Sequence, residues 1–377
     1  MKQVILILAA GLIGFSFGHA EMFWPLIVLS FLLPVIWVQT ESRALSGGLM
    51  LVYSLVASRG LLVGASVYFD ASLLVGAFWW VSGALLWFTT GFLCWHKNRR
   101  VRVALIPVLM LLLIIPPTGL SGWAHPLISA SYLFPSFGFF GLFLCLLLML
   151  VSSAFVSRAG EFIALSLMLV VASYVLKKPD ISPPSHFIPH QTSFVFNAGS
   201  RNFPQEFQNM KSLQASISKA GKGIHWTPES TGGVWSATTK SFWVQWAKKH
   251  KDKTVLLSVL DPKGGSLNNV IILLSGDEQE VVYRQRFPVP GVNKFPEPET
   301  ITNYKSEVVA GTKIGFLICY ETLMFWPVIQ TMLDQPELLL VNGSVGWSPE
   351  SIWNVQRASA FAFSQLFNVP LVEAWNK

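Results

Sequence analysis

Three polar segments in the second half of the chain lie where predicted strands end. Glu229 follows a short strand in the segment IHWTPES. Cys319 ends the strand of the segment KIGFLICYE, with Glu321 two residues later. The third segment, VVYRQRFPVPG, follows a hairpin strand. Because α/β folds build their sites beyond the carboxyl ends of their strands, we expect this thiol and these carboxylates to lie near one another.

Cys319 is the only cysteine after residue 176, so it has no disulfide partner in that part of the chain. A buried, inert thiol is one interpretation, since free cysteine is among the most buried residue types. The alternative is a nucleophile, which needs a lowered thiol pKa. A helix that begins at Leu323 would help to lower it. On the residues alone, both interpretations stay open.

The pattern of apolar residues predicts the elements that position these side chains. Strands alternate with amphipathic helices, which indicates a layered α/β domain. The predicted strands are 193–197, 223–226, 254–260, 268–275, 280–286, 313–319 and 338–342, and the predicted helices are 204–220, 240–250, 323–334 and 350–367.

Charged side chains are distributed unevenly along the 377 residues. Only 12% of the residues are charged, 52% are hydrophobic, and the mean hydropathy is +0.50. An average soluble domain carries about twice that charged fraction. Twelve charged side chains lie in residues 1–176 and the other 35 in 177–377. We therefore expect a membrane domain at 1–176, a Pro-rich linker at 177–192 and an α/β domain at 193–377.

Seven apolar segments of the first half are long enough to predict membrane-spanning helices, which need about 20 mostly apolar residues. Basic residues favour the cytoplasmic side, and the strongest basic cluster is HKNRRVR at 96–102. We therefore expect the N-terminus in the cytoplasm and the α/β domain on the periplasmic face of a bacterial inner membrane. The seven segments are 3–19, 22–38, 45–69, 72–95, 103–120, 136–156 and 160–176.

Two further features of the first half lead to structural predictions. Residues 116–135 are rich in Pro, Gly and Trp, which predicts an outer interfacial loop or a re-entrant segment, with Trp123 and Tyr132 at the lipid headgroups. Arg59 falls near the middle of the third predicted span. It either faces a polar partner such as a lipid headgroup, or the span is shifted and Arg59 reaches an interface.

Taken in order, WTPES, a YRxR-type segment and GFLICYE resemble the carbon–nitrogen hydrolase (nitrilase) superfamily. With its multi-span first half, the chain resembles the apolipoprotein N-acyltransferases over nearly its whole length. The stretches TSFVFNAGSRNFPQ, SLNNVIILL, LLLVNGSVGW and WNVQRASAFAFSQLFNVPLVEAWN are similar to that family as well. The resemblance implies a multi-span α-helical membrane domain followed by an α/β nitrilase-like domain, an αββα sandwich.

The resemblance also implies a chemistry. In that family a Cys thiolate attacks a carbonyl and forms a thioester, a Glu is general base and acid, and a Lys stabilises the oxyanion. The acyl donor is a phospholipid, and the acceptor is the N-terminal amine of a lipidated Cys in another protein. By position, Glu229 matches the base, Cys319 the nucleophile and Glu321 the Glu that follows it.

The sequence departs from the family at two positions near the site. Gln285 stands where the family has Lys, so it offers a neutral hydrogen bond and no positive charge. Asn293 stands where a second family Glu is expected. Arg284, Arg286 or Lys294 could restore a cation, although an Arg does not readily exchange protons.

A third departure lies at the other end of the domain. After NVPLVEAWN the family continues with further strands and a membrane helix, which this sequence lacks. We therefore expect a C-terminally shortened sandwich with one sheet edge that is unpaired or covered by another segment. Shortened relatives of this kind occur among conjugal transfer proteins of the TraB type, and the chain resembles that branch.

Three classes of function remain. The first is an enzyme for acyl transfer or amide hydrolysis at the outer face of the membrane. The second is a catalytically degenerate relative that serves a conjugation or envelope machine as a structural component. The third, a transporter, has little support because no inverted repeat is visible. No motif predicts a metal, a cofactor or direct binding of nucleic acid.

Overall fold

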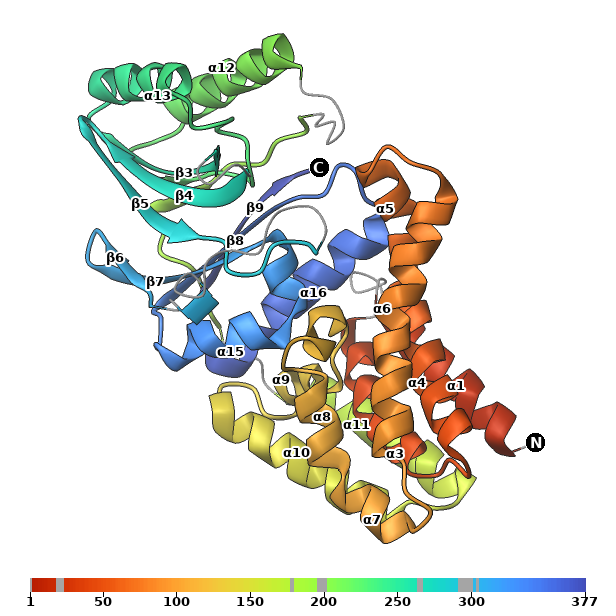
Figure 1. Cartoon of the computed structure of the whole chain (residues 1–377). Coiled ribbons are helices and arrows are strands. Elements are labelled where there is room, and N and C mark those ends of the chain that lie inside the picture. Colours follow the sequence, from red (N-terminus) through yellow and green to blue (C-terminus); the bar gives the residue numbers. More distant parts are fainter. Residues whose placement is uncertain are drawn as a thin grey trace.

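The computed structural model describes residues 2–17, 24–176, 180–194, 202–262, 267–290, 301–302 and 305–377. Helices make up the first half, and two β-sheets with flanking helices make up the second (Figure 1). Part of the strand predicted at 193–197 lies outside the described residues, as do Asn293 and Lys294.

The helices of the first half differ widely in length. Two of them, α6 and α10, are long and apolar enough to cross a membrane, and the bent pair α4–α5 would make a third. Three shorter apolar helices accompany them, so the expectation of seven spans is not confirmed. The elements are α1 (Lys2–Ser16), η1 (Trp24–Phe31), α3 (Leu32–Trp37), α4 (Arg43–Ala57), α5 (Leu61–Tyr68), α6 (Leu73–Cys94), α7 (Arg99–Ala104), α8 (Ile106–Leu112), η2 (Thr118–Ser121), η3 (Pro126–Ser129), α9 (Ala130–Leu133), α10 (Gly138–Phe155) and α11 (Ala159–Val175).

Two predicted spans are interrupted. Residues 45–69 form α4 and α5, which meet at 58°. Arg59 lies in this break, where its Nη1 donates to the Val56 carbonyl at 3.0 Å and its guanidinium lies 4.6 Å from the ring centre of Phe15. The span predicted at 103–120 ends early, because α8 stops at Leu112 and two prolines, which have no N–H to donate, follow at 116–117.

Residues 116–135, expected to be an interfacial loop or a re-entrant segment, bury most of their aromatic side chains within the protein. They fold into η2, η3 and α9, and Trp123 and Tyr132 are buried. Trp123 packs edge-on against Tyr320 of the α/β domain, with ring centres 6.4 Å apart. This segment therefore forms part of the contact between the two halves.

The second half contains two mixed sheets. The first has the strand order β1-β2-β3-β4-β5, in which β1 to β3 are parallel and β4 and β5 form an antiparallel hairpin. The second has the order β6-β7-β8-β9, with β7 to β9 parallel. The strands are β1 (Phe187–Pro189), β2 (Gly223–Trp226), β3 (Lys253–Asp261), β4 (Asn268–Ser275), β5 (Glu278–Arg284), β6 (Glu307–Val309), β7 (Thr312–Ile318), β8 (Leu338–Ser344) and β9 (Leu371–Asn376).

The two sheets pack face to face between two layers of helices, so the expected αββα sandwich is present. Trp226 and Leu256 of the first sheet share one core with Phe316 and Leu340 of the second. The other face of the first sheet is covered by α12 (Phe203–Lys219) and α13 (Ala237–Lys249). The other face of the second sheet is covered by α15 (Phe325–Leu333) and α16 (Glu350–Phe367).

The segment expected to be a linker takes part in both sheets. Its strand β1 pairs with β2, and Thr192 forms a parallel bridge with Asn376 of β9. The side chain of Gln191 accepts from the Trp375 N–H and donates to the Glu373 carbonyl. The edge of the second sheet, expected to be unpaired or covered, is therefore covered by residues 191–194.

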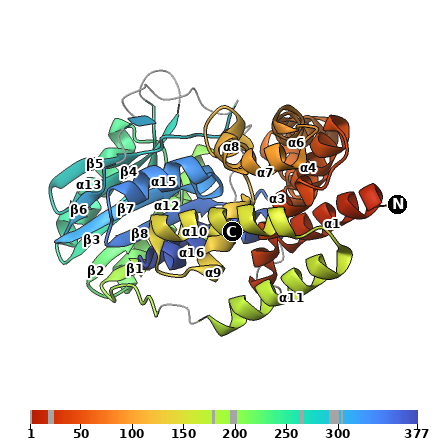
Figure 2. The same cartoon turned by 90° about the horizontal axis from the view of Figure 1, so that it is seen from below.

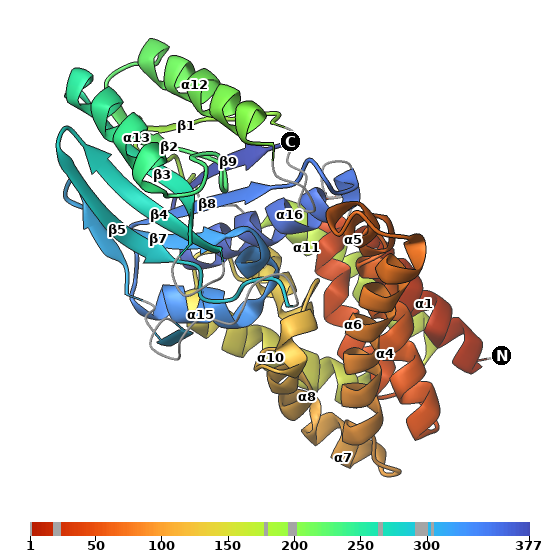
Figure 3. The same ribbon diagram turned by 45° about the horizontal axis from the view of Figure 1, so that its top comes forward.

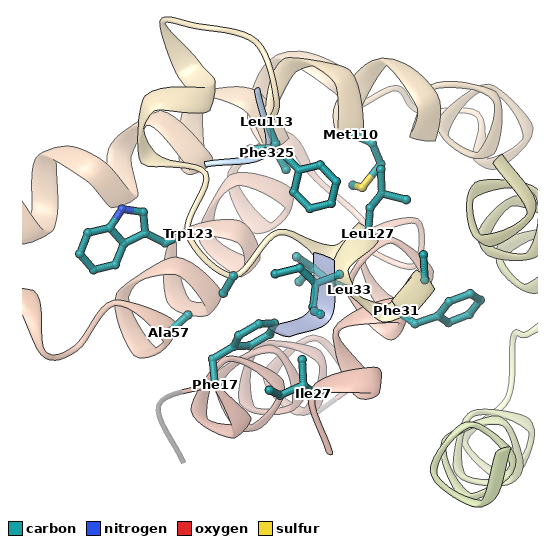
Figure 4. Packing of buried hydrophobic residues seen from close by; sticks show 14 of the residues in the cluster. Phe17, Ile27, Phe31, Leu33, Ala57, Met110, Leu113, Trp123, Leu127 and Phe325 are labelled. Carbon is teal, nitrogen blue, oxygen red and sulfur yellow. The ribbon is translucent and has the colours of Figure 1, made fainter. Parts of the chain in front are cut away.

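One hydrophobic core runs from the helical half into the α/β half. It includes Phe17, Leu33 and Leu127 of the first half together with Phe325 of α15 (Figure 4). Figure 2 shows α16 between the strands and the helices of the first half. The two halves are thus packed on each other, and the second sheet meets the helical half through α15 and α16.

Candidate active site

Cys319 is the residue that directly follows β7, and it opens the short helix η5 (Cys319–Leu323). Its φ is +50°, a left-handed conformation that is uncommon for residues other than glycine. The side chain is 6% exposed. A strained backbone at the end of a strand is typical of functional positions, where surrounding structure holds the conformation in place.

Glu229 lies in the turn after β2, and its buried carboxylate interacts electrostatically with the thiol of Cys319. Its Oε1 accepts from Asn269 Nδ2 at 2.8 Å, and its Oε2 accepts from the Ser344 N–H at 2.8 Å. These contacts hold the carboxylate in place from one strand of each sheet, β4 and β8. The structure therefore brings Glu229 and Cys319 together, although they are 90 residues apart in sequence.

The two groups have perturbed pKa values. Burial raises the pKa of the Glu229 carboxyl to about 7, although hydrogen bonds from Cys319, Ser344 and Asn269 oppose the shift. Burial, and then the charge of Glu229, raises the pKa of the Cys319 thiol well above its usual value. The resting site thus holds a protonated thiol beside a carboxylate that can accept a proton near neutral pH.

The expected helix at Leu323 does not lower the thiol pKa. The helical turn η5 begins at Cys319 itself, and the next helix, α15, begins at Phe325. The thiol lies in a dry environment where the cost of desolvating a thiolate dominates. A thiol in this environment would be activated by proton transfer to Glu229 rather than by a permanent negative charge.

Gln285 follows β5 and joins the same network. Its Oε1 accepts from Asn269 Nδ2 at 2.9 Å, and its Nε2 donates to the Ile318 carbonyl at 3.2 Å. Asn269 therefore connects Gln285 to Glu229, and Gln285 contacts the strand that ends at Cys319. Both ends of the Gln285 amide already have protein partners.

Glu321 is fully buried and surrounded by donors. Its Oε1 accepts from the N–H groups of Arg286 (2.8 Å) and Phe287 (3.3 Å), and its Oε2 accepts from the Tyr283 hydroxyl (2.8 Å) and the Ile318 N–H (2.9 Å). These bonds join the loop after β5 to the turn that carries Cys319. Glu321 therefore positions the turn that carries Cys319.

Neither of the described candidate cations is free for an oxyanion. Arg284 forms an ion pair with Asp261 at 2.7 Å. The Arg286 guanidinium is buried 3.7 Å from Glu321, and its Nη2 donates to Thr331 at 2.7 Å. Both arginines thus have structural partners away from Cys319.

A cavity of about 390 Å³ leads to Cys319 from the first half of the chain. Most of its lining is apolar or aromatic, which is typical of pockets for hydrophobic ligands. It lies between α4, α5, α6 and residues 117–123 on one side and η5 and the start of α16 on the other; Figure 3 shows α5 beside α16. The lining includes Ser54, Tyr68, Trp79, Trp80, Gly83, Leu120, Trp123, Cys319, Tyr320, Trp347 and Gln356.

Sequence reasoning missed three polar residues of the site. They are Asn269, which links Glu229 to Gln285; Ser344, whose N–H holds Glu229; and Gln356, whose Nε2 lies 3.8 Å from the Cys319 sulfur. Only Asn269 could have been predicted from the sequence. It lies at the start of the predicted strand 268–275, and the strand paired with it ends next to Gln285. The other two reach the site through the packing of β8 and α16.

His225 lies near Glu229 in sequence but in another part of the structure. It is buried in β2, and its Nδ1 lies 3.0 Å from His190 Nε2. Among the described residues, no group of three His, Cys, Asp or Glu side chains is arranged to hold a metal ion.

Two conjugal transfer proteins are similar to the chain along nearly its full length. "Conjugal transfer protein TraB" of Agrobacterium fabrum (strain C58) is 30% identical over 406 residues, which cover 99% of this chain and 92% of that protein. "Probable conjugal transfer protein TraB" of Sinorhizobium fredii (strain NGR234) is 26% identical, with 98% and 96% covered. No protein-family model matches the chain.

Solved carbon–nitrogen hydrolases resemble about half of the chain. The enzyme from Helicobacter pylori G27 covers 49% of this chain and 71% of its own length, at 13% identity and a TM-score of 0.37. Nit3 from Saccharomyces cerevisiae, of the nitrilase superfamily, covers 50% and 73%, at 12% identity and a TM-score of 0.38. These structures are too distant to assign a role to any residue.

Proposed function

The chain belongs to the TraB family of conjugal transfer proteins, and on that premise we propose that it is a membrane-anchored, nitrilase-like acyltransferase. In this proposal Cys319 carries an acyl group taken from a lipid. The observation that supports it most is the position of the thiol. Cys319 interacts electrostatically with Glu229 and also lines an apolar cavity whose other wall is formed by helices of the first half.

Membrane anchoring is supported by the apolar surface of the helical half. Soluble proteins rarely expose contiguous apolar patches of more than a few hundred Å². Several helices here expose large apolar side chains along their length, notably α1, α6, α10 and α11. The most exposed are Leu12 (74%), Leu74 (80%), Phe155 (78%) and Val175 (74%).

The orientation follows from the basic residues around α7. Helix α6 separates α5, at the cavity, from α7, so these two elements lie at opposite ends of α6 (Figure 1). A basic cluster favours the cytoplasmic side. In our proposal α7 and the N-terminus are therefore cytoplasmic, and the cavity and the α/β domain lie at the outer face of the inner membrane.

The proposed reaction has two balanced steps. First, Cys319 Sγ attacks the ester carbonyl carbon of the lipid while Glu229 takes the thiol proton. The oxyanion then collapses, the bond to the lipid alcohol breaks, and Glu229 returns the proton to that alcohol, leaving a thioester. Second, an amine of a protein or peptide attacks the thioester, Glu229 takes its proton, and the sulfur leaves and is reprotonated. Water in place of the amine would give hydrolysis.

Trapping of the acyl intermediate tests this proposal. Cells that express the chain in their membranes are fed an alkyne-bearing fatty acid, and the chain is examined for a label that hydroxylamine removes. We expect the label on the wild type and on Cys145→Ala, because Cys145 is buried in α10. We expect none on Cys319→Ala or Glu229→Gln. A label that survives Cys319→Ala would contradict the proposal.

A second candidate function is a degenerate relative that serves the conjugation apparatus as a binding component. It is favoured by Gln285, whose amide is engaged by Asn269 and Ile318 where the family resemblance implies a Lys. The variant Gln285→Lys separates the two candidates. A thioester that appears only in this variant would favour the degenerate form, and a thioester in the wild type would exclude it.

A further inference from the structure

Tyr68 is a side chain of the helical half that reaches the candidate active site. It is the last residue of α5 and lines the same cavity as Cys319. Its ring packs edge-on against Trp347, with ring centres 5.0 Å apart and an angle of 70°. Trp347 itself lies three residues after Ser344, whose N–H holds Glu229.

The start and middle of α5 lie close against the α/β domain. A Cβ at Gly64 would lie 2.8 Å from the side chain of Ile352 and 3.0 Å from that of Trp347. A Cβ at Gly60 would lie 2.5 Å from the Ser351 hydroxyl. A larger residue at either position would make these side chains shift, so α5, which ends at Tyr68, packs closely against residues 347–352.

The Tyr68 hydroxyl is close to the reacting groups and is not engaged elsewhere. Tyr68 lies within electrostatic range of both Glu229 and Cys319. Within the part of the chain that the structure describes, no hydrogen bond is formed by this hydroxyl. It therefore retains a donor that can be directed at a group entering the cavity.

Acyl transfer at Cys319 would require a hydrogen-bond donor for an oxyanion, and the Tyr68 hydroxyl can supply one. A tetrahedral intermediate on Cys319 places a negative charge on the former carbonyl oxygen, and this charge requires a donor. The Gln285 amide already bonds to Asn269 and Ile318, so it retains one N–H and supplies no charge. Arg284 and Arg286 form ion pairs with Asp261 and Glu321. Neutral tyrosine hydroxyls are effective oxyanion donors in dry sites.

We propose that Tyr68 is a catalytic residue whose hydroxyl donates a hydrogen bond to the oxyanion formed when Cys319 attacks an acyl carbonyl. This inference rests on the proposed acyl transfer and assigns to the helical half a direct part in the chemistry. Loss of one oxyanion donor typically slows such reactions by about 100- to 1000-fold.

The test uses a long-chain alkyl trifluoromethyl ketone on the full-length protein in detergent. Cys319 Sγ adds to the ketone carbon, its proton passes to Glu229, and the oxygen becomes an oxyanion with no leaving group. We expect Tyr68→Phe to weaken this adduct by about 100-fold. The matched control Tyr174→Phe removes a hydroxyl from a 71% exposed tyrosine on α11 and should leave the adduct unchanged.

A second measurement excludes a general disturbance of the site. Alkylation of Cys319 by iodoacetamide forms no oxyanion, so Tyr68→Phe should leave its rate unchanged. If Tyr68→Phe bound the ketone as tightly as the wild type, the inference would be wrong. If the wild type formed no ketone adduct through Cys319, it would be wrong as well.

The two proposals can fail separately. A ketone adduct that depends on Tyr68, in a protein that never forms an acyl thioester, would uphold the role of Tyr68 and overturn acyl transfer from lipid. A thioester that forms at the same rate in Tyr68→Phe and the wild type would uphold acyl transfer and overturn the role of Tyr68.

Discussion

At the scale of single residues, the site is a protonated thiol beside a carboxylate whose pKa is raised to about 7 by burial. This arrangement differs from a preformed thiolate, because Cys319 needs no permanent charge. Within the proposed function, Glu229 is the group that sets the pH dependence, since only its deprotonated form can accept the thiol proton.

We predict that thioester formation rises with pH through about 7 and levels off above about 8. The sign follows from the role of Glu229. Below its pKa the carboxyl is protonated and cannot act as a base, and above it the base is present in full. The measurement is the initial rate of labelling of Cys319 between about pH 5.5 and pH 9.

Asn269→Leu provides an internal check on that assignment. It removes the hydrogen bond to Glu229 Oε1, which stabilises the charged carboxylate. The pKa of Glu229, and with it the midpoint of the rate profile, should therefore move to higher pH. A midpoint that stays in place would mean that another group controls the rate.

At the scale of elements, a buried ion pair joins the loop after β5 to the turn of Cys319. Arg286 and Glu321 are 1% and 0% exposed, and Glu321 also accepts from Tyr283 and from the Ile318 N–H. Removal of one charge leaves the other buried without its partner, which is more costly than removal of both.

We predict that Glu321→Gln lowers the free energy of unfolding by about 3 kcal/mol, because Arg286 keeps its charge in a dry environment. The double variant Glu321→Gln/Arg286→Met should recover part of this loss. The control is Glu337→Gln, whose carboxylate contacts the Lys313 N–H at an exposed position. Thermal unfolding in detergent measures the order of stability, and a double variant less stable than the single one would contradict the prediction.

Much of the α/β domain was predictable from the sequence at this scale. The strand predicted at 268–275 coincides with β4, and that predicted at 254–260 lies within β3. Their apolar runs and flanking turn residues are local signals. The sequence did not predict strand β1 or the pairing of residues 191–194 with β9. Short segments such as 187–189 acquire their structure only from distant partners.

The candidate site was predictable in part for the same reason. Glu229, Gln285 and Cys319 stand at strand ends and follow recognisable segments, and the structure places them together. Tyr68 and Gln356 carry no local signal. They join the site because α5 and α16 pack on each other, which depends on contacts between residues about 290 positions apart.

At the scale of the whole molecule, the cavity belongs to neither half alone. Helices α4 to α6 supply one wall, and η5 with the start of α16 supplies the other. Within the proposed function, the shape of the helical wall should therefore select the acyl chain, while the α/β domain supplies the chemistry.

We predict that Gly83→Leu reduces labelling of Cys319 by long alkyne fatty acids more than labelling by short ones. Gly83 lines the cavity, and its Cβ position lies only 3.7 Å from the Ser121 Cβ, so a leucine fits the backbone but occupies cavity space. Gly48→Leu is the control, because no atom lies within 4 Å of its Cβ position. Equal losses for all chain lengths would contradict a role of this wall in selection.

The cover of β9 by residues 191–194 also has a consequence for biosynthesis. Thr192 is made 184 residues before its partner Asn376, and ribosomes add about 5–20 residues per second. The segment therefore waits roughly 10–40 s for the strand it borders. In the last part of that interval, after β8 (Leu338–Ser344) has been made and before β9 (Leu371–Asn376) follows, β8 presents an open edge. Chaperones that protect nascent chains from aggregation are therefore needed most while the edge of β8 is open.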